Sequence, residues 1–187
     1  MEGLPQPAGL RIRLAGRGDL PVLVELRRLV GWNSGGLEGS LLAAEAGRQV
    51  LLLAEWQGRP AGAVALSLQP MGGGGFGRGH ISDLLVTPLY RRRGIGTALL
   101  RAAEQEIAGR GLAEATLDVD AGNRTALRLY LGNGYHHHRP ARFPWGPGYT
   151  LRKVLRPDAL PVPPRPGQGG RLTRLWRRWS PGSGLGP

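Results

Sequence analysis

The sequence predicts an α/β domain of the α+β type, with a mixed, mostly antiparallel sheet of six to seven strands flanked by about four helices. Two strand-like runs at 49–56 and 60–68 are joined by a short turn and predict an antiparallel hairpin. A strand at 80–86, a helix at 94–110 and a strand at 115–119 then form a βαβ unit, which predicts one parallel pair. Apolar residues make up 41% of the 187 residues, enough for one core.

The N-terminal part of the chain supplies a first strand and two helices. Leu10–Leu14 indicates a short strand, and Asp19 is an N-cap residue type followed by Pro21, which favours a helix start. A loop at 31–36 then leads to a second short helix at 37–46. The first helix is expected to turn four apolar side chains inward: Leu23, Leu26, Leu29 and Val30.

The βαβ unit is the centre of the predicted domain. A glycine-rich link at 71–79 precedes its first strand, and the run at 115–119 is apolar enough to predict a buried strand. The helix between the two strands carries one apolar face, formed by Ile95, Leu99, Ala102, Ala103 and Ile107.

One helix and two strands close the predicted domain. The helix is expected to start at Asn123 and to run through Tyr130. Strands are predicted at 135–139 and 149–155. The domain is therefore placed at 1–155.

Residues 156–187 are predicted to form a Pro/Gly/Arg-rich linker and a basic tail. Four large apolar side chains recur in the tail with the spacing of one helix face, opposite several arginines, which predicts a short amphipathic helix. Three roles stay open for it: docking on a membrane surface or a protein partner, packing on its own domain or a second subunit, and a disordered basic end. The apolar residues are Leu172, Leu175, Trp176 and Trp179.

The composition excludes several kinds of site. The chain has no cysteine, which excludes disulfides, zinc–cysteine sites and thiol nucleophiles. Lys153 is its only lysine, so a Walker-type phosphate loop is excluded. The formal charge of +12 is carried almost wholly by arginine and attracts anions without selecting among them, so no specific nucleic acid is predicted. Residues 1–14 lack the apolar run of a signal peptide, and a cytoplasmic protein is expected.

A phosphate-binding turn is predicted between the strand at 80–86 and the helix that follows it. The run Arg91-Arg92-Arg93-Gly94-Ile95-Gly96 opens that helix. Free backbone N–H groups and the positive end of the helix macrodipole attract a pyrophosphate, glycines permit close approach, and arginines add charge-assisted hydrogen bonds. A dinucleotide-binding fingerprint is disfavoured because Leu99 stands where its third glycine belongs.

The turn resembles the signature [Q/R]-x-x-G-x-[G/A] of the GNAT acetyltransferase superfamily, through Arg91, Gly94 and Gly96. A second stretch is similar to the family pattern N-x-x-A-x-x-L-Y-x-x-x-G-[F/Y]. It is formed by Asn123, Ala126, Leu129, Tyr130, Gly134 and Tyr135. The resemblance covers about 10–155, excludes the tail, and implies a sheet whose central strands are splayed.

The resemblance implies that acetyl-CoA lies in a wedge between the strands at 80–86 and 115–119. Backbone groups of Leu85 and Val86 are expected to contact the pantetheine arm, and an N–H near Leu85 to polarise the thioester carbonyl. Asn123 is expected to contact the cofactor arm, or to cap its helix, or both. The implied cofactor-binding residues are Leu85, Val86, Arg91, Arg92, Arg93, Gly94, Ile95, Gly96, Thr97, Asn123 and Tyr130.

Two catalytic residues are expected, a base and an acid. An alkylamine must lose a proton before it attacks, and His80 occupies a place where some family members carry a Glu or His base. The alternative is a surface histidine at a strand end; Asp83 is a less favoured base, because strand alternation points it to the opposite face. Tyr130 matches the family's usual acid for the CoA thiolate, and its alternative is a tyrosine packed in the core.

Trp32 and Trp145 lie in predicted loops that border the acceptor groove in the family, where they form an aromatic wall or anchor their loops. No metal is expected, because His136, His137 and His138 alternate faces in a strand and lack a carboxylate at ligand spacing.

These residues predict an N-acetyltransferase that transfers the acetyl group of acetyl-CoA to a primary amine, of a small molecule or a protein, by direct attack in a ternary complex. The alternative is a non-catalytic CoA-binding module that docks to membrane, nucleic acid or a protein partner through its basic tail. A monomer or a homodimer is expected.

Overall fold

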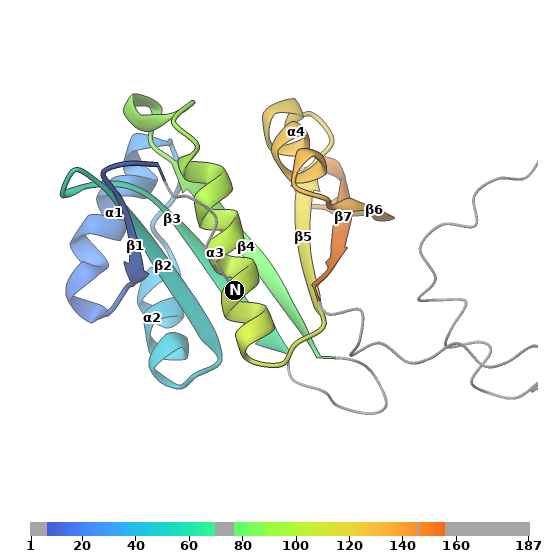
Figure 1. Ribbon diagram of the computed structural model, residues 1–187, viewed down its shortest axis with the longest axis horizontal. Helices are drawn as coiled ribbons and strands as arrows, with labels where there is room; N and C mark the ends of the chain where they lie inside the picture. The colour runs from blue at the N-terminus through green and yellow to red at the C-terminus, as the bar shows by residue number, and fades with distance from the viewer. Residues whose placement is uncertain (1–6, 70–76, 145, 156–187) are drawn as a thin grey trace, which may run out of the picture.

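A computed structural model describes residues 7–69, 77–144 and 146–155. The predicted tail helix at 172–179 and Trp145 lie outside the described residues. Within them the chain forms one seven-stranded sheet in the order β1-β2-β3-β4-β5-β7-β6 (Figure 1). The strands are β1 (Leu10–Leu14), β2 (Gln49–Trp56), β3 (Arg59–Gln69), β4 (Arg78–Val86), β5 (Glu114–Asp120), β6 (His136–Phe143) and β7 (Gly146–Val154).

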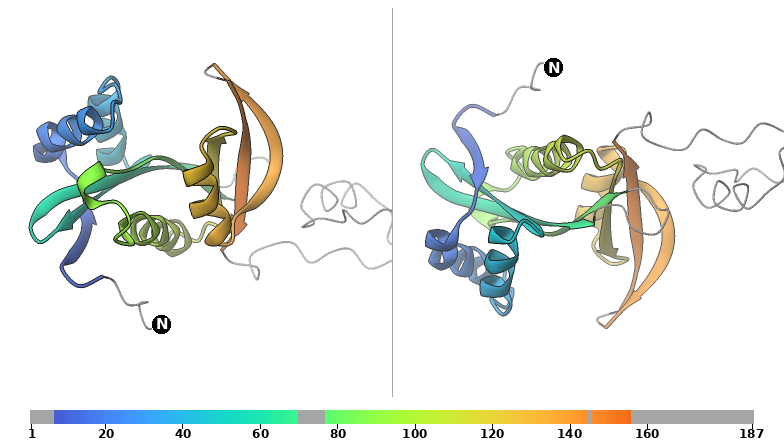
Figure 2. Two further views of the ribbon diagram at one scale, coloured as in Figure 1. Left: turned by 90° about the horizontal axis from the view of Figure 1, so that it is seen from above. Right: turned by 90° about the horizontal axis from the view of Figure 1, so that it is seen from below.

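Helices cover both faces of this sheet (Figure 2). Leu23 and Leu26 of α1 are buried against β2 and β3 on one face, while Leu99 and Ile107 of α3 are buried on the other. Side chains of β2 alternate between the two cores, as a strand buried on both faces requires. The helices are η1 (Arg17–Asp19), α1 (Leu20–Leu29), α2 (Leu37–Glu45), η2 (Pro88–Tyr90), α3 (Ile95–Gly109) and α4 (Arg124–Gly132).

One expectation for α1 needs correction, and another is confirmed in position only. Leu29 is 46% exposed rather than inward-facing, because it is the last helical residue and falls to the side of the stripe formed by Leu23 and Leu26. Asp19 occupies the N-cap position but makes no capping hydrogen bond. Its carboxylate instead accepts hydrogen bonds from the Arg13 guanidinium, at 2.7 and 2.9 Å, and so ties β1 to the start of α1.

A β-bulge in β4 changes the direction of its side chains. The register with β3 shifts between Ala63 and Ala65, and Asp83 adopts a left-handed backbone with φ 51°. Ile81 packs in the α3 core, so its neighbour His80 faces the α1 side of the sheet. Asp83 forms an ion pair with α1 and therefore faces the same side. The expectation that His80 and Asp83 point to opposite faces is wrong, because regular alternation stops at the bulge.

The parallel pair predicted from the βαβ unit is present and short. β4 and β5 pair over four positions, from Arg78↔Glu114 to Ile81↔Leu117. Beyond Ile81 the two strands diverge, and Figure 1 shows them opening towards the ends at which α3 and α4 begin. The splayed centre of the sheet is therefore confirmed.

Candidate active site

A cleft of about 560 Å³ lies at the open end of β4 and β5. Its walls come from the last residues of β4, the turn before α3, the first turns of α4 and the loop after α1. Its lining includes Trp32, Leu84, Val86, Arg91, Gly96 and Tyr130.

The turn before α3 is shaped by backbone conformations that expose the helix N-terminus. Gly94, the N-cap of α3, has φ 76°, and Arg92 has φ 64°. Ile95 is buried and anchors the first turn of the helix in the core. Gly96 faces the cleft, where a β-carbon would meet Leu129 at 3.5 Å. Free N–H groups at the start of this 15-residue helix therefore point into a space that admits an anion.

The three arginines of the turn point in different directions. Arg91 and Arg92 line the cleft, and the Arg91 Nε atom donates to the Val86 carbonyl at 3.1 Å. The Arg93 guanidinium lies 5.5 Å from the centre of the Trp56 ring, a cation–π contact with the end of β2. Arg93 does not line the cleft.

Backbone groups of β4 also face the opening. The Thr87 N–H donates to the Ala61 carbonyl at 3.0 Å. In an antiparallel pair, every second residue turns its N–H and carbonyl groups towards the partner strand. Leu85, two residues before Thr87, therefore also turns its backbone groups towards β3. The backbone groups of Leu84 and Val86 then point towards β5, from which β4 has separated.

Two residues of the α4 segment complete the cleft. Asn123 caps α4, because its side-chain oxygen accepts a hydrogen bond from the Ala126 N–H at 3.0 Å, and it also lines the cleft. Tyr130 is 8% exposed, and burial raises its pKa to about 12. The Tyr130 hydroxyl therefore keeps its proton at neutral pH, as a proton donor must.

His80 lies outside the cleft lining, on the α1 side of the sheet where β4 and β5 begin to separate. Its Nδ1 atom lies 3.2 Å from the Thr116 hydroxyl, and its Nε2 atom 3.9 Å from the Asp118 carboxylate. Asp118 also accepts a hydrogen bond from the Thr150 hydroxyl at 2.7 Å. The structure therefore adds Asp118 to the candidate residues around His80 that were predicted from the sequence. Its sign in the sequence is a charged residue between two apolar ones, Leu117 and Val119, both of which are buried.

The profile of a family described as "Acetyltransferase (GNAT) family" matches residues 26–135, more than half of the chain. The chain belongs to the GNAT acetyltransferase family. Membership confirms the family predicted from the sequence.

Known GNAT proteins resemble this chain in sequence over short stretches. "Acetyl transferase GW6a" of Oryza sativa subsp. japonica is 38% identical over 74 residues, which cover 39% of this chain and 18% of the relative. "Mycothiol acetyltransferase" of a Nocardioides species is 34% identical over 95 residues, which cover 51% of this chain and 30% of the relative. The matched stretches thus span less than a third of either relative.

Solved GNAT structures share the fold over nearly their whole length. An N-acetyltransferase of Thermoplasma acidophilum, in complex with coenzyme A, has a TM-score of 0.63 and 19% identity, covering 78% of this chain and 98% of its own. Naa50 of Arabidopsis thaliana, in complex with a bisubstrate analogue, has a TM-score of 0.66 and 20% identity, covering 79% and 99%. The predicted fold is thereby confirmed.

Trp32 and the three consecutive histidines of β6 are further residues that were singled out in the sequence of this GNAT domain. Trp32 lines the cleft and is 43% exposed, so it is available to a ligand. His137 packs edge-on against Tyr149, with ring centres 4.6 Å apart, while burial lowers the pKa of His136 and His138. No group of three His, Asp or Glu side chains converges in the described part of the chain.

The helices described for this GNAT domain are all too short or too polar to cross a lipid bilayer.

Proposed function

We propose that the protein is an N-acetyltransferase that transfers the acetyl group of acetyl-CoA to a primary amine by direct attack in a ternary complex. One observation carries the proposal: the cleft opens where β4 and β5 separate, and it is lined both by the N-terminus of α3 and by the largely buried Tyr130. An anion site and a proton donor thus border the same space.

In this proposal the pyrophosphate of acetyl-CoA lies on the N-terminus of α3, beside Arg91 and Arg92. The pantetheine arm runs along the free edge of β4, where Leu84 and Val86 present backbone groups. An N–H of that edge then donates to the thioester carbonyl, and one such donor contributes about 2.7 to 4 kcal/mol to lowering the barrier.

His80 is the proposed base. The Thr116 hydroxyl donates to the Gly79 carbonyl at 3.4 Å, so it accepts from the His80 Nδ1–H and leaves Nε2 free to take a proton. Asp118 then lies beside the imidazolium that forms. The neutral amine attacks the carbonyl carbon, the C–S bond breaks, and the departing thiolate takes the Tyr130 proton.

A peptide or protein α-amine is the first acceptor to test. The similar Naa50 structure holds a bisubstrate analogue that joins CoA to the peptide MVNAL. An α-amine has a pKa of about 8 rather than the ~10.4 of a lysine side chain, so it needs less help from a base to lose its proton.

Titration calorimetry with acetyl-CoA tests the cofactor site. Gly96→Glu adds a carboxylate in the first turn of α3, where it favours the helix but repels the pyrophosphate, so we expect at least a tenfold weaker Kd, or ~1.4 kcal/mol. Gly39→Glu is the matched control, because Gly39 lies in the first turn of α2 with open space around it.

Turnover is then followed by thiol release with peptides that begin with Ala or Met, an Nα-blocked peptide with one lysine, and putrescine. Turnover that requires an unblocked α-amine supports the proposed acceptor. Absence of acetyl-CoA binding by the wild-type protein contradicts the proposed function altogether.

A further inference from the structure

Arg27 lies at the C-terminal end of α1, next to Arg28, but the two side chains have different surroundings. The Arg28 side chain is 69% exposed and pairs with Glu25 of its own helix. The Arg27 side chain is 12% exposed. A largely buried guanidinium is retained only where its donors are satisfied, so the contacts of Arg27 indicate a specific task.

Arg27 organises the loop that follows α1. Its Nη1 atom donates to the carbonyls of Asn33 and Gly35, at 3.1 and 3.3 Å. Its own carbonyl accepts the Trp32 N–H at 2.8 Å. The loop therefore folds back around one side chain, and Trp32, which this loop carries, forms part of the cleft wall.

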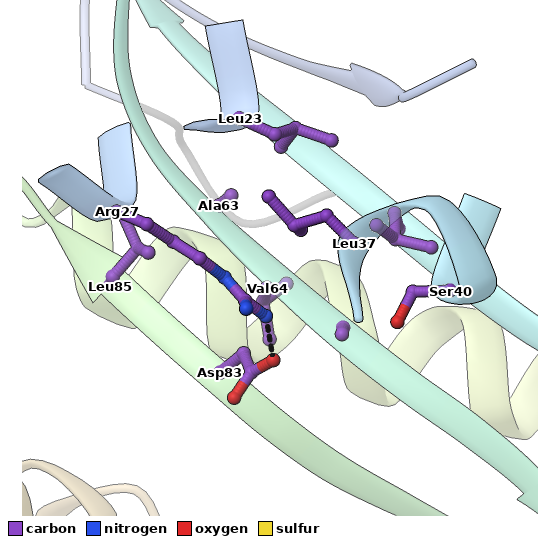
Figure 3. Close-up of a pocket in the computed structure, with 10 residues that line it drawn as sticks. Leu23, Arg27, Leu37, Ser40, Ala63, Val64, Asp83 and Leu85 are labelled. Carbon is purple, nitrogen blue, oxygen red and sulfur yellow. Dashed lines mark hydrogen bonds and ion pairs between the residues drawn. The ribbon is translucent and has the colours of Figure 1, made fainter. Parts of the chain in front are cut away.

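The other end of the same guanidinium holds the bulge in β4. Figure 3 shows the Arg27 side chain reaching past Ala63 of β3 to Asp83, and its Nη2 atom donates to the Asp83 carboxylate. Asp83 has φ 51°, a backbone that residues other than Gly, Asn and Asp rarely adopt. The residues directly after it, Leu84 to Val86, form the β4 wall of the cleft.

We propose that Arg27 is a positioning residue that fixes the Trp32 loop and the β4 edge relative to each other, and so sets the acceptor side of the cleft. The inference rests on the proposed function. Arginine suits this task because its planar fork serves three acceptors at once, whereas the single ammonium of lysine cannot span them. The turn before α3 makes no contact with Arg27 among the described hydrogen bonds, so the pyrophosphate end of the proposed cofactor site is expected to be independent of it.

The test compares Arg27→Lys and Asp83→Asn with the control Arg28→Lys. Asparagine tolerates the left-handed backbone, so Asp83→Asn removes the charge and keeps the bulge. With the Ala-initiated peptide as acceptor, we expect KM to rise about tenfold in both variants, and the double variant to be no worse than either. The Kd of acetyl-CoA is expected to change less than threefold, because the proposed pyrophosphate contacts at the turn before α3 are left in place. Arg28→Lys is expected to match the wild type. If KM is unchanged and Tm is lowered, Arg27 stabilises the fold but does not position the acceptor side of the cleft, and the proposal is wrong.

Amide hydrogen exchange of the unliganded protein supplies a readout that needs no turnover. Arg27→Lys is expected to speed exchange both in the loop at 32–36 and in β4 at 84–86. Faster exchange in only one of the two segments overturns the proposed coupling, even if no amine is acetylated. Failure of the proposed function is recognised separately, by the absence of acetyl-CoA binding in the wild type.

Discussion

Tyr130 and Tyr135 show how two neighbouring tyrosines of one core differ in what they contact. Their ring centres are 6.1 Å apart, and burial is the main cause that raises the pKa of both hydroxyls. Tyr130 lines the cleft, whereas Tyr135 lies beside Glu104, away from the cleft lining, without a well-formed hydrogen bond. The pair therefore offers an internal control for the proposed acid.

Tyr130→Phe is expected to lower kcat about 100-fold, because the variant cannot protonate the departing thiolate. The Kd of acetyl-CoA is expected to stay within about threefold, since the ring remains in place. Stopped-flow thiol release and calorimetry measure the two quantities. Tyr135→Phe should retain wild-type kcat; a similar fall in both variants points to damage of the shared core rather than to a lost proton.

Among single residues, those of the proposed cofactor side leave more local pattern in the sequence than those of the proposed acceptor side. Glycines and arginines at fixed spacing identified the turn before α3, and Asn123 and Tyr130 were predicted to lie near it. Asp118 was missed, because its importance depends on its closeness to His80, which belongs to another strand. A contact between residues of two different strands leaves no pattern of local spacing in the sequence.

Elements that depend on local patterns were predicted almost to the residue. The hairpin of β2 and β3 and the helices α1 and α3 follow from periodicity and turn residues. The bulge at Asp83 was not predicted, because no glycine marks the left-handed position. It depends instead on an ion pair with Arg27, which is 56 residues away in the chain.

Gly62 permits the close approach of β3 to β4 just after this bulge. A β-carbon at position 62 would lie 2.5 Å from the Leu85 carbonyl oxygen and 3.2 Å from Leu99. Gly62→Ala is therefore expected to destabilise the fold by ~1–3 kcal/mol, and to weaken acetyl-CoA binding by moving the β4 wall.

Urea unfolding and calorimetry check this expectation. Gly39→Ala is the matched control, since nothing lies within 4 Å of its added carbon and alanine favours the helix, so its stability should equal or exceed that of wild type. Equal stabilities of the Gly62 variant and wild type would contradict the close approach.

For the whole molecule, the buried tyrosines predict a loss of stability at alkaline pH. The pKa of Tyr130 is about 12 in the folded protein against 10.0 for the free side chain. Above pH 10 the unfolded chain releases this proton while the folded protein keeps it, so the free energy of unfolding falls as pH rises. Tyr130 alone contributes a loss of roughly 1 kcal/mol at pH 11, and Tyr135 acts in the same direction.

Urea midpoints between pH 8 and pH 11 measure this loss. The double variant Tyr130→Phe/Tyr135→Phe is expected to show a flatter profile over the same range. If the two profiles run parallel, the buried hydroxyls are not the cause.

The short parallel seam between β4 and β5 also divides the chain into two successive segments. Strands β1 to β4 join neighbours along the chain, and β5, β7 and β6 form a second antiparallel group that begins at Glu114. Contacts close in sequence form quickly, whereas the parallel pair must wait for α3 to cross between its strands. We therefore expect the two groups to assemble first and the seam to close last. The cleft, which exists only once both groups have docked, would then be among the final parts of the native structure to appear during folding.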